Sequence, residues 1–215
     1  MRRTITALLG LCLLMVSLGA AQAATEGQDY ERLRRQNLAE PGADRVEVVE
    51  VFWYGCPHCY TLEPMVAEWL ERRGDEVNFV RVPATLNRNW EPHARAFYVA
   101  QALDVFEQAH PALFRALHEE NKRLDDRKSL AKFFTQFGVE PKAFNEAWDA
   151  FGTQTRLRRD QGLIKKYRLF GVPAMVVDGQ YLVTIDKAGS YPRMLEIVDE
   201  LIAQAQPAAA AASAD

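Results

Sequence analysis

Two cysteines separated by two residues are the part of this 215-residue chain best suited to chemistry. Cys56 and Cys59 enclose a proline and a histidine, and the one other cysteine is Cys12, near the N-terminus. A pair with this spacing can form a structural disulfide, contribute to a metal site, or alternate between dithiol and disulfide. These three interpretations make different demands on the rest of the sequence.

The structural and metal interpretations are poorly supported. A disulfide across so short a loop removes little entropy from the unfolded chain, on the order of 2 kcal/mol in the loop-closure model. A structural zinc site needs about four ligands, usually including a second cysteine or histidine pair. The four histidines (58, 93, 110 and 118) supply no such pair, and a c-type haem motif would need histidine in place of Tyr60.

The position of the pair favours redox chemistry. Residues 45–55 are rich in valine and aromatic residues on both faces, which predicts a strand buried on both sides. Residues 56–73 carry apolar side chains at helical spacing. Cys56 therefore lies at a predicted helix N-terminus, where free backbone N–H groups and the helix dipole stabilise a thiolate.

The other three residues of the motif have predicted roles too. Pro57 suits the first helical turn, because its missing N–H costs nothing there. His58, when protonated, adds positive charge beside Cys56. Cys59 lies one turn further in and is the candidate resolving thiol. Because the thiolate exists only in the reduced form, each unit by which the pKa of Cys56 falls stabilises the dithiol by about 1.4 kcal/mol, or about 30 mV. The sequence predicts a disulfide that is readily donated to other thiols.

The remaining elements predict a sheet interrupted by helices. Residues 77–84 read as a second strand, and two further strands at 174–178 and 180–185 are joined by the turn-forming pair Asp178-Gly179. Residues 87–161 contain five amphipathic segments with short connections, which indicates a compact helical unit. We therefore predict a discontinuous α/β domain, residues 24–86 and 162–206, with an inserted helical domain, residues 87–161. A final helix is predicted over 191–203, followed by a flexible alanine-rich tail, residues 207–215.

The first 23 residues have the pattern of a Sec-type signal peptide. Two arginines precede an apolar run over 5–18, and Ala21-Gln22-Ala23 fits a cleavage site after Ala23. A membrane anchor is the less favoured alternative, because the run is short and no basic flank follows it. Cleavage would leave two cysteines in a compartment where disulfides persist. It would also take the formal charge from −3 to −5, which argues against a nucleic-acid binder.

Three segments together resemble the DsbA family of bacterial periplasmic disulfide oxidoreductases, in the thioredoxin superfamily. They are the Cys-Pro-His-Cys motif, the preceding Glu50-Val51-Phe52, and Gly-Val-Pro-Ala-Met at residues 171–175. The resemblance covers almost the whole chain after the signal segment. It implies an α/β thioredoxin fold with an inserted all-helical domain.

The resemblance also implies a function. The protein would donate its Cys56–Cys59 disulfide to reduced, newly secreted proteins in the periplasm and act as a monomer. A DsbB-type quinone-linked membrane protein would reoxidise it, and no metal or organic cofactor would be needed. Two alternatives stay open: a disulfide isomerase or reductase, and a non-catalytic secreted peptide-binding module.

Several residues outside the motif acquire expected roles from the resemblance. Pro173 should follow a cis peptide bond and lie, with Val172, against the cysteine pair, where the Val172 backbone could pair with an extended substrate. Glu50 interrupts an apolar strand, and burial there would raise its pKa and let it relay protons to Cys59.

Four further positions complete the set of candidate site residues. A lysine accompanies the glutamate in better-known relatives, whereas this chain has Arg81, which can form the ion pair but cannot release its proton. Glu63 matches an acidic position of the family, although a solvated helix residue is an equal alternative. Trp53 and its neighbour Tyr54 could either line a groove for unfolded clients or simply pack.

Overall fold

The computed structural model describes residues 23–36 and 45–212. The predicted signal peptide therefore lies outside the described residues, except for Ala23. Within the described part of the chain, no helix has both the length and the apolar character needed to cross a membrane.

In the described residues, five strands form one mixed sheet in the spatial order β1-β5-β4-β2-β3. Their bounds are Glu31–Arg32 (β1), Val46–Phe52 (β2), Val77–Pro83 (β3), Ala174–Val177 (β4) and Tyr181–Thr184 (β5). β2 pairs in parallel with β3 and antiparallel with β4, so both of its edges are hydrogen-bonded. All of its residues are buried, as the run of valines predicts.

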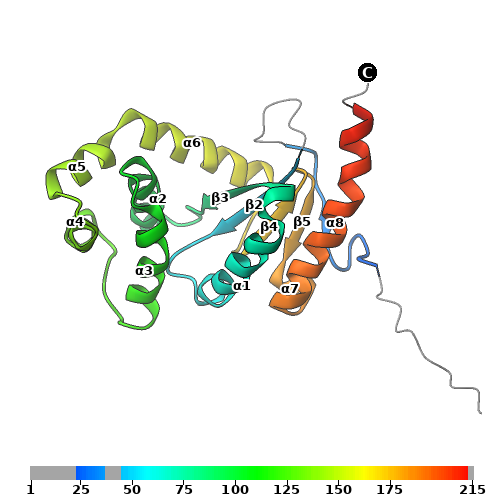
Figure 1. Ribbon diagram of the computed structural model, residues 1–215, viewed down its shortest axis with the longest axis horizontal. Helices are drawn as coiled ribbons and strands as arrows, with labels where there is room; N and C mark the ends of the chain where they lie inside the picture. Colours follow the sequence, from blue (N-terminus) through cyan, green and yellow to red (C-terminus); the bar gives the residue numbers. More distant parts are fainter. Residues whose placement is uncertain (1–22, 37–44, 213–215) are drawn as a thin grey trace, which may run out of the picture.

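The helices follow the predicted order of segments. Their bounds are Pro57–Arg73 (α1), Glu91–Ala102 (α2), Phe106–His118 (α3), Arg127–Phe134 (α4), Pro141–Asp149 (α5), Phe151–Lys166 (α6), Ile185–Ala188 (α7) and Tyr191–Ala212 (α8). Three 3₁₀ turns lie at Gly74–Glu76, Arg88–Trp90 and Thr135–Phe137. Helices α2 to α5 gather at one end of the molecule, beyond the sheet (Figure 1).

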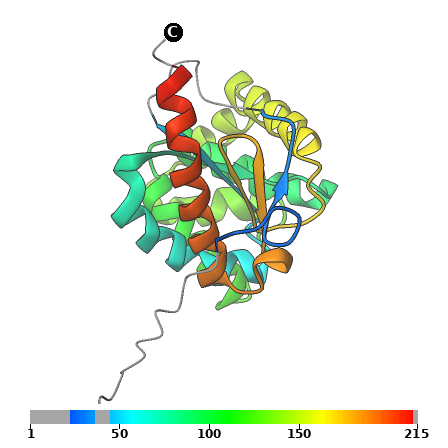
Figure 2. The ribbon, with the colours of Figure 1, turned by 90° about the vertical axis from the view of Figure 1, so that its right-hand side faces the viewer.

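The two faces of β2 pack against different helices. Val46 and Val48 share a hydrophobic cluster with residues of α1 and α8, whereas Val49 and Val51 pack with residues of α6. Figure 2 shows α1 and α8 on one side of the sheet and α6 on the other. Because side chains alternate along a strand, Glu50 lies on the α1 side together with Val46 and Val48.

The helical unit is continuous with the cysteine end of the sheet. Phe52, Tyr54 and both cysteines belong to the same buried cluster as Phe97 of α2 and residues of α3 to α6. The boundary predicted between residues 161 and 162 falls inside α6, which runs unbroken from the helical unit to the sheet. The helices thus form one wall of the region around the cysteines.

The structure differs from the sequence prediction at both ends of the sheet domain. The two-residue strand β1 and the short helix α7 were not predicted, because neither is long enough to show a periodic pattern. The last helix also extends beyond the predicted end at residue 203, since α8 continues to Ala212, inside the segment predicted to be a flexible tail. Alanine is the strongest helix former, and it continues the helix beyond Pro207.

The predicted hairpin is confirmed. β4 and β5 pair antiparallel across Asp178 and Gly179, whose φ angles are 52° and 64°. Two consecutive positive φ angles are the requirement of a type I′ turn, and aspartate followed by glycine meets it at low cost. This hairpin carries β4 back beside β2, directly after the Val172-Pro173 segment.

Candidate active site

The turn between β2 and α1 sets the position of Cys56. Cys56 is the N-cap of α1, with φ −88° and ψ 118°, and Pro57 occupies the first helical turn. The Cys56 N–H donates to the carbonyl oxygen of Trp53 over 3.0 Å. A Cβ atom on Gly55 would lie 2.3 Å from the Trp53 ring, so only glycine fits there. The free N–H groups of the helix therefore face the Cys56 sulfur, as predicted.

The two cysteines differ sharply in environment. Both are free thiols in this structure, with Cys56 7% exposed and Cys59 fully buried. A hydrogen bond from the Cys59 thiol lowers the pKa of Cys56 from 9.0 to about 6, helped by backbone N–H groups and the charge of His58 and opposed by burial. Burial, together with the hydrogen bond to Cys56 and its charge, raises the pKa of Cys59 far above its ordinary range. Cys56 is thus the thiolate of the pair, and Cys59 holds a proton.

His58 projects from the first turn of α1 toward the start of α8. Its side chain is exposed, and its Nδ1 lies 2.8 Å from the hydroxyl of Tyr191. The sequence contained no signal for this contact, because Tyr191 is the first residue of a helix that begins far along the chain. Tyr191 is thus a residue of the site that sequence reasoning missed.

The proline loop lies against the nucleophile. The Val172–Pro173 peptide bond is cis, which confirms the expectation. The Cys56 Sγ lies 3.5 Å from the carbonyl oxygen of Val172, while Pro173 itself is buried. Just before this loop, Phe170 is 94% exposed, one of two large apolar side chains the described residues present to solvent.

Glu50 is a buried acid below the cysteine pair. Its side chain is 1% exposed, and the predicted ion pair with Arg81 is present, with Arg81 Nε 3.1 Å from Glu50 Oε2. Burial raises the pKa of Glu50 from 4.5 to about 7; Arg81 opposes this rise, and the charge of Glu63 adds to it. The charge of Glu50 also contributes to the raised pKa of Cys59, so the two groups interact electrostatically. At neutral pH Glu50 can therefore both release and accept a proton.

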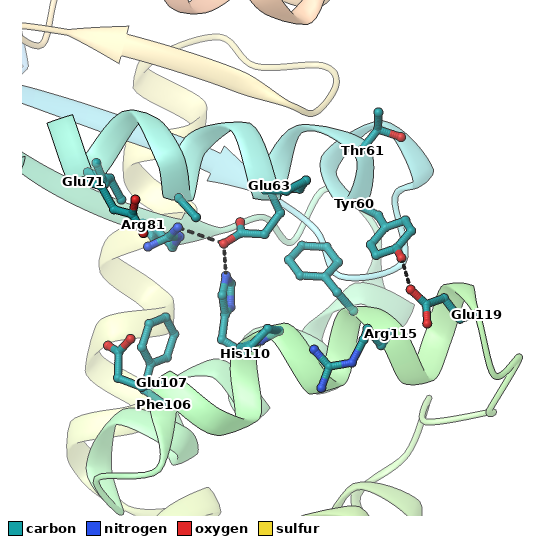
Figure 3. A pocket seen from close by; sticks show the side chains of 15 residues that line it. Tyr60, Thr61, Glu63, Glu71, Arg81, Phe106, Glu107, His110, Arg115 and Glu119 are labelled. Carbon is teal, nitrogen blue, oxygen red and sulfur yellow. Dashed lines mark hydrogen bonds and ion pairs between the residues drawn. The ribbon is translucent and has the colours of Figure 1, made fainter. Parts of the chain in front are cut away.

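The polar chain continues from Arg81 to Glu63, for which the sequence left two interpretations open, and to His110, which the sequence did not connect with the site. Arg81 donates to Glu63 Oε1 over 3.0 Å, and His110 Nε2 lies 3.2 Å from the same oxygen. On its other side, His110 Nδ1 lies 2.6 Å from the hydroxyl of Tyr54. Figure 3 shows Glu63 reaching from α1 between Arg81 and His110. His110 was considered only as a metal ligand, because nothing in its local sequence indicates packing against α1.

A cavity of about 870 Å³ opens between α1 and α3 beside this polar chain. Glu63, Arg81 and His110 line it, together with apolar residues that include Phe106 and Phe114 (Figure 3). Glu50 is not among the residues of its wall. The cavity thus reaches the far side of the Arg81 ion pairs but not the buried acid next to Cys59.

The two aromatic residues before the motif are held by packing. Trp53 stacks on Trp90 with ring centroids 4.2 Å apart and planes 5° from parallel, and it stays partly exposed. Tyr54 is buried, and its backbone carbonyl lies 2.7 Å from His118 Nε2. For Tyr54 the packing alternative therefore holds.

The arrangement supports one kind of chemistry. A sulfur that is anionic near neutral pH, next to a fully buried sulfur that holds a proton, forms a pair that can exchange a disulfide with an external thiol. In the described parts of the chain, no group of three or more His, Cys, Asp or Glu side chains could hold a metal ion. The molecule is a thiol:disulfide oxidoreductase built on a thioredoxin-like sheet.

The family follows from comparison with known proteins. The family model of the DSBA-like thioredoxin domain matches residues 47–196, and the chain belongs to this family. The match includes the cysteine motif, the helical insertion and the proline loop. It confirms the predicted fold class, a thioredoxin fold with an inserted helical domain.

Relatives match over nearly the full length. The thiol:disulfide interchange protein DsbA of Pseudomonas syringae is 36% identical over 207 residues, covering 96% of this chain and 96% of that protein. The protein of the same name from Burkholderia cepacia is 35% identical over 204 residues, 91% of this chain and 96% of that protein. The crystal structure of Pseudomonas aeruginosa DsbA is similar with a TM-score of 0.81 at 35% identity, covering 86% of this chain and 96% of that one.

Proposed function

We propose that this protein is a periplasmic oxidase that donates its Cys56–Cys59 disulfide to reduced, newly secreted proteins. The observation that carries the proposal is the asymmetry of the pair, with the pKa of Cys56 lowered to about 6 and that of Cys59 raised. Stabilising the thiolate stabilises the reduced form, and this makes the disulfide an oxidant.

The reaction consists of two exchange steps. A client thiolate attacks Cys56 Sγ, the Cys56–Cys59 bond breaks, and the electron pair leaves on the Cys59 sulfur, which then takes up a proton. A second client thiolate attacks the client sulfur of the mixed disulfide and releases Cys56 as a thiolate. The client loses two electrons in forming its disulfide, and the protein gains them.

Glu50 is the proposed source of the proton for Cys59. The leaving sulfur is fully buried, so bulk water does not reach it directly. Glu50 lies on the same side of β2 as α1, and its pKa of about 7 lets it hold a proton at neutral pH. Arg81, flanked by two carboxylates, keeps its own proton, because their charges outweigh the effect of burial and raise its pKa. We therefore assign Arg81 the role of an electrostatic partner rather than of a proton carrier.

Client binding is assigned to the proline loop and its surroundings. The Val172 backbone next to the Cys56 sulfur is the proposed pairing edge for an extended client segment. Trp53, partly exposed directly after β2, is the proposed apolar contact for the client. Residues 24–86 and 162–206 would form the thioredoxin-like domain that carries these groups, with residues 87–161 as the helical domain above them.

Turnover requires an external oxidant for the reduced pair. We assign this role to a DsbB-type quinone-linked membrane protein, on the basis of the family resemblance. Residues 1–23 are the proposed signal peptide that delivers the protein to the periplasm, where it would act as a monomer. The Cys56–Cys59 disulfide is the proposed redox group, with no metal or organic cofactor.

Equilibration of the purified protein in glutathione buffers of graded ratio tests the oxidase function. The reduced and oxidised fractions, separated after acid quench and thiol alkylation, give the reduction potential. An oxidase becomes reduced even in relatively oxidising mixtures, whereas an isomerase or reductase is poised lower. A potential below about −300 mV, typical of a structural disulfide, would reject the proposal in favour of a non-catalytic binding module.

A further inference from the structure

Two largely buried carboxylates share one guanidinium below the cysteine pair. Arg81 Nε lies 3.1 Å from Glu50 Oε2, and another nitrogen of the same guanidinium donates to Glu63 Oε1 over 3.0 Å. The Glu50 side chain is 1% exposed and that of Glu63 is 14% exposed. Because one cation cannot fully compensate two buried anions, one of the two carboxyl groups is favoured to keep a proton at neutral pH.

His110 makes the two carboxylates unequal. Its Nε2 lies 3.2 Å from Glu63 Oε1, the oxygen that also accepts from Arg81. Among the described residues, the charged groups that act on Glu50 are Arg81 and Glu63, with no histidine. Tyr54 fixes which nitrogen of the imidazole carries the proton. Burial raises the pKa of Tyr54, so its hydroxyl keeps the hydrogen and can donate to His110 Nδ1, 2.6 Å away. With Nδ1 accepting, a neutral His110 carries its hydrogen on Nε2, which faces Glu63.

We propose that His110 is a positioning residue that holds the negative charge on Glu63 and thereby leaves the exchangeable proton on Glu50. This inference rests on the proton-carrier role proposed for Glu50. The His110 side chain touches neither sulfur and acts through Glu63 and Arg81.

The charges around the two groups agree with this assignment. Arg81 of β3 and Glu63 of α1 face Glu50, and Cys59, which is also on α1, interacts with it electrostatically. His110 faces Glu63 from α1, Arg81 from β3 and Tyr54 from the turn before α1, while Glu107 lies on its own helix. Burial lowers the pKa of His110, so the ring is neutral at pH 7 and presents Nε2 to Glu63 Oε1 over 3.2 Å as a polar contact rather than as a full charge. Burial raises the pKa of Glu63, but His110 and Arg81 outweigh it and leave that pKa below its ordinary value.

The place of the proton matters because the two acids face different surroundings. Glu63 lines the cavity between α1 and α3, whereas Glu50 is fully enclosed and interacts electrostatically with Cys59. A proton held on Glu63 would weaken the contacts of that carboxylate with Arg81 and His110. A proton held on Glu50 is available when Cys59 leaves as a thiolate.

Carbon-13 NMR of protein labelled at the glutamate carboxyl carbons tests the inference without relying on activity. The titrations of Glu50 and Glu63 are followed against pH in the wild type, in His110→Leu and in His110→Gln, with signals assigned through Glu50→Gln and Glu63→Gln. Leucine removes the donor to Glu63, whereas the glutamine amide can still donate. In His110→Leu we expect the titration midpoint of Glu50 to fall by about 1 pH unit or more and that of Glu63 to rise. The reason is that Arg81 then stabilises the anion of Glu50 more than that of Glu63. His110→Gln should restore most of the wild-type order.

Unchanged midpoints in a folded His110→Leu would overturn the inference. If that variant does not fold, Tyr54→Phe provides the same test, because it removes the hydroxyl that fixes the imidazole tautomer and leaves His110 in place. The expected result there is a smaller fall of the Glu50 midpoint, and no fall would again overturn the inference. The two proposals fail separately. If Glu50→Gln leaves client oxidation unaffected while the midpoints move as expected, the proton-carrier role fails and the role of His110 stands.

Discussion

The two sulfurs at the first turn of α1 lie in different environments, one on the outer side of the turn and one on the inner side. On the outer side, Cys56 meets the Val172 carbonyl and the exposed His58 near solvent. On the inner side, Cys59 is fully buried above Glu50 and its partner Arg81. In the proposed mechanism, the client sulfur therefore reacts on the outer side, whereas the proton for Cys59 comes from the inner side, from which water is excluded.

Each face of β2 buries one carboxylate. On the α6 side, Glu47 is 2% exposed and lies on the same face as Val49 and Val51, which pack against Leu163 and Ile164. On the α1 side, Glu50 is 1% exposed and has Arg81 beside it. Glu50 is therefore the buried acid of β2 that lies on the side of the helix beginning at the cysteines.

The largest expected effect comes from removing the outer sulfur. Cys56→Ser should abolish oxidation of a reduced two-cysteine peptide, because no other described thiol is accessible to it. Cys59→Ala is the matched control: its Cys56 thiolate should attack oxidised glutathione, form a mixed disulfide and release one glutathione thiolate, whereas Cys56→Ser should not. Thiol alkylation and mass spectrometry of the products distinguish the two results. Residual client oxidation by Cys56→Ser would place the chemistry elsewhere.

The thiolate titration of the reduced protein tests the difference between the two sulfurs directly. Absorbance near 240 nm should show one thiolate with a midpoint of about 6, against 9.0 for an ordinary cysteine. In Cys59→Ala the midpoint should rise, since the hydrogen bond from Cys59 is the largest cause of the low pKa. A wild-type midpoint near 9 would contradict the proposed origin of the oxidising disulfide.

The same shift predicts how the stability of the reduced protein depends on pH. Because the pKa of Cys56 is lowered on folding, the thiolate stabilises the reduced form fully above about pH 9. This stabilisation should be lost as the pH falls through about 6. Denaturation curves of the reduced and oxidised proteins across this range provide the measurement, and the oxidised protein, which has no thiolate, is the control.

Removing the inner acid should have a smaller effect on rate. Glu50→Gln should slow client oxidation by on the order of 10²-fold near pH 7, because the leaving Cys59 loses its proton donor. The rate should also lose its dependence on a group with a pKa of about 7. Stopped-flow fluorescence over pH 5 to 9 measures both, and a pH profile identical to that of the wild type would exclude Glu50 from the relay.

Glu50 should also affect the free energy of unfolding, and the pH dependence of its contribution should have the opposite sign to that of Cys56. Its pKa is raised on folding, so the stabilisation is present below about pH 4.5 and is lost as the pH rises through about 7. This loss amounts to on the order of 3 kcal/mol. In Glu50→Gln the free energy of unfolding should decline less as the pH rises. Urea titrations of the wild type and the variant at pH 4.5 and pH 8 measure this difference.

The smallest expected effect concerns the outer side again. Tyr191→Phe removes the hydroxyl 2.8 Å from His58 Nδ1 and leaves the packing of the ring unchanged. The pKa of Cys56 should rise by less than about 0.5 unit, because exposed polar contacts contribute little. The 240 nm titration detects the change. A larger rise would mean that the contact between Tyr191 and His58 affects the pKa of Cys56 more than expected for an exposed pair.

Local pattern was enough to predict the elements that carry the motif. The valines of residues 46–52 predicted a fully buried strand, and the apolar spacing after Cys56 predicted α1. Together they placed Cys56 at a helix N-terminus, because a strand and a helix in direct succession leave no other position for it. The Asp178-Gly179 turn was equally local, since both residues tolerate positive φ.

Contacts between distant segments could not be predicted in this way. His110 reaches Glu63 only because α3 packs beside α1, and Tyr191 reaches His58 only because α8 begins next to the motif. A histidine or tyrosine on an amphipathic helix looks the same in sequence whether it meets solvent or a buried carboxylate. The strand β1 was missed for a related reason, since it consists of two residues paired with β5.

The sequence by itself determined which sulfur becomes the thiolate, because backbone N–H groups at a helix N-terminus are a property of the adjoining chain. It also determined that an acid would be buried beneath the pair, since Glu50 interrupts an apolar strand. Only the tertiary structure decided how that acid is balanced. The distribution of charge among Glu50, Arg81 and Glu63 depends on distances between three elements, and electrostatic energies in a buried site change steeply with such distances.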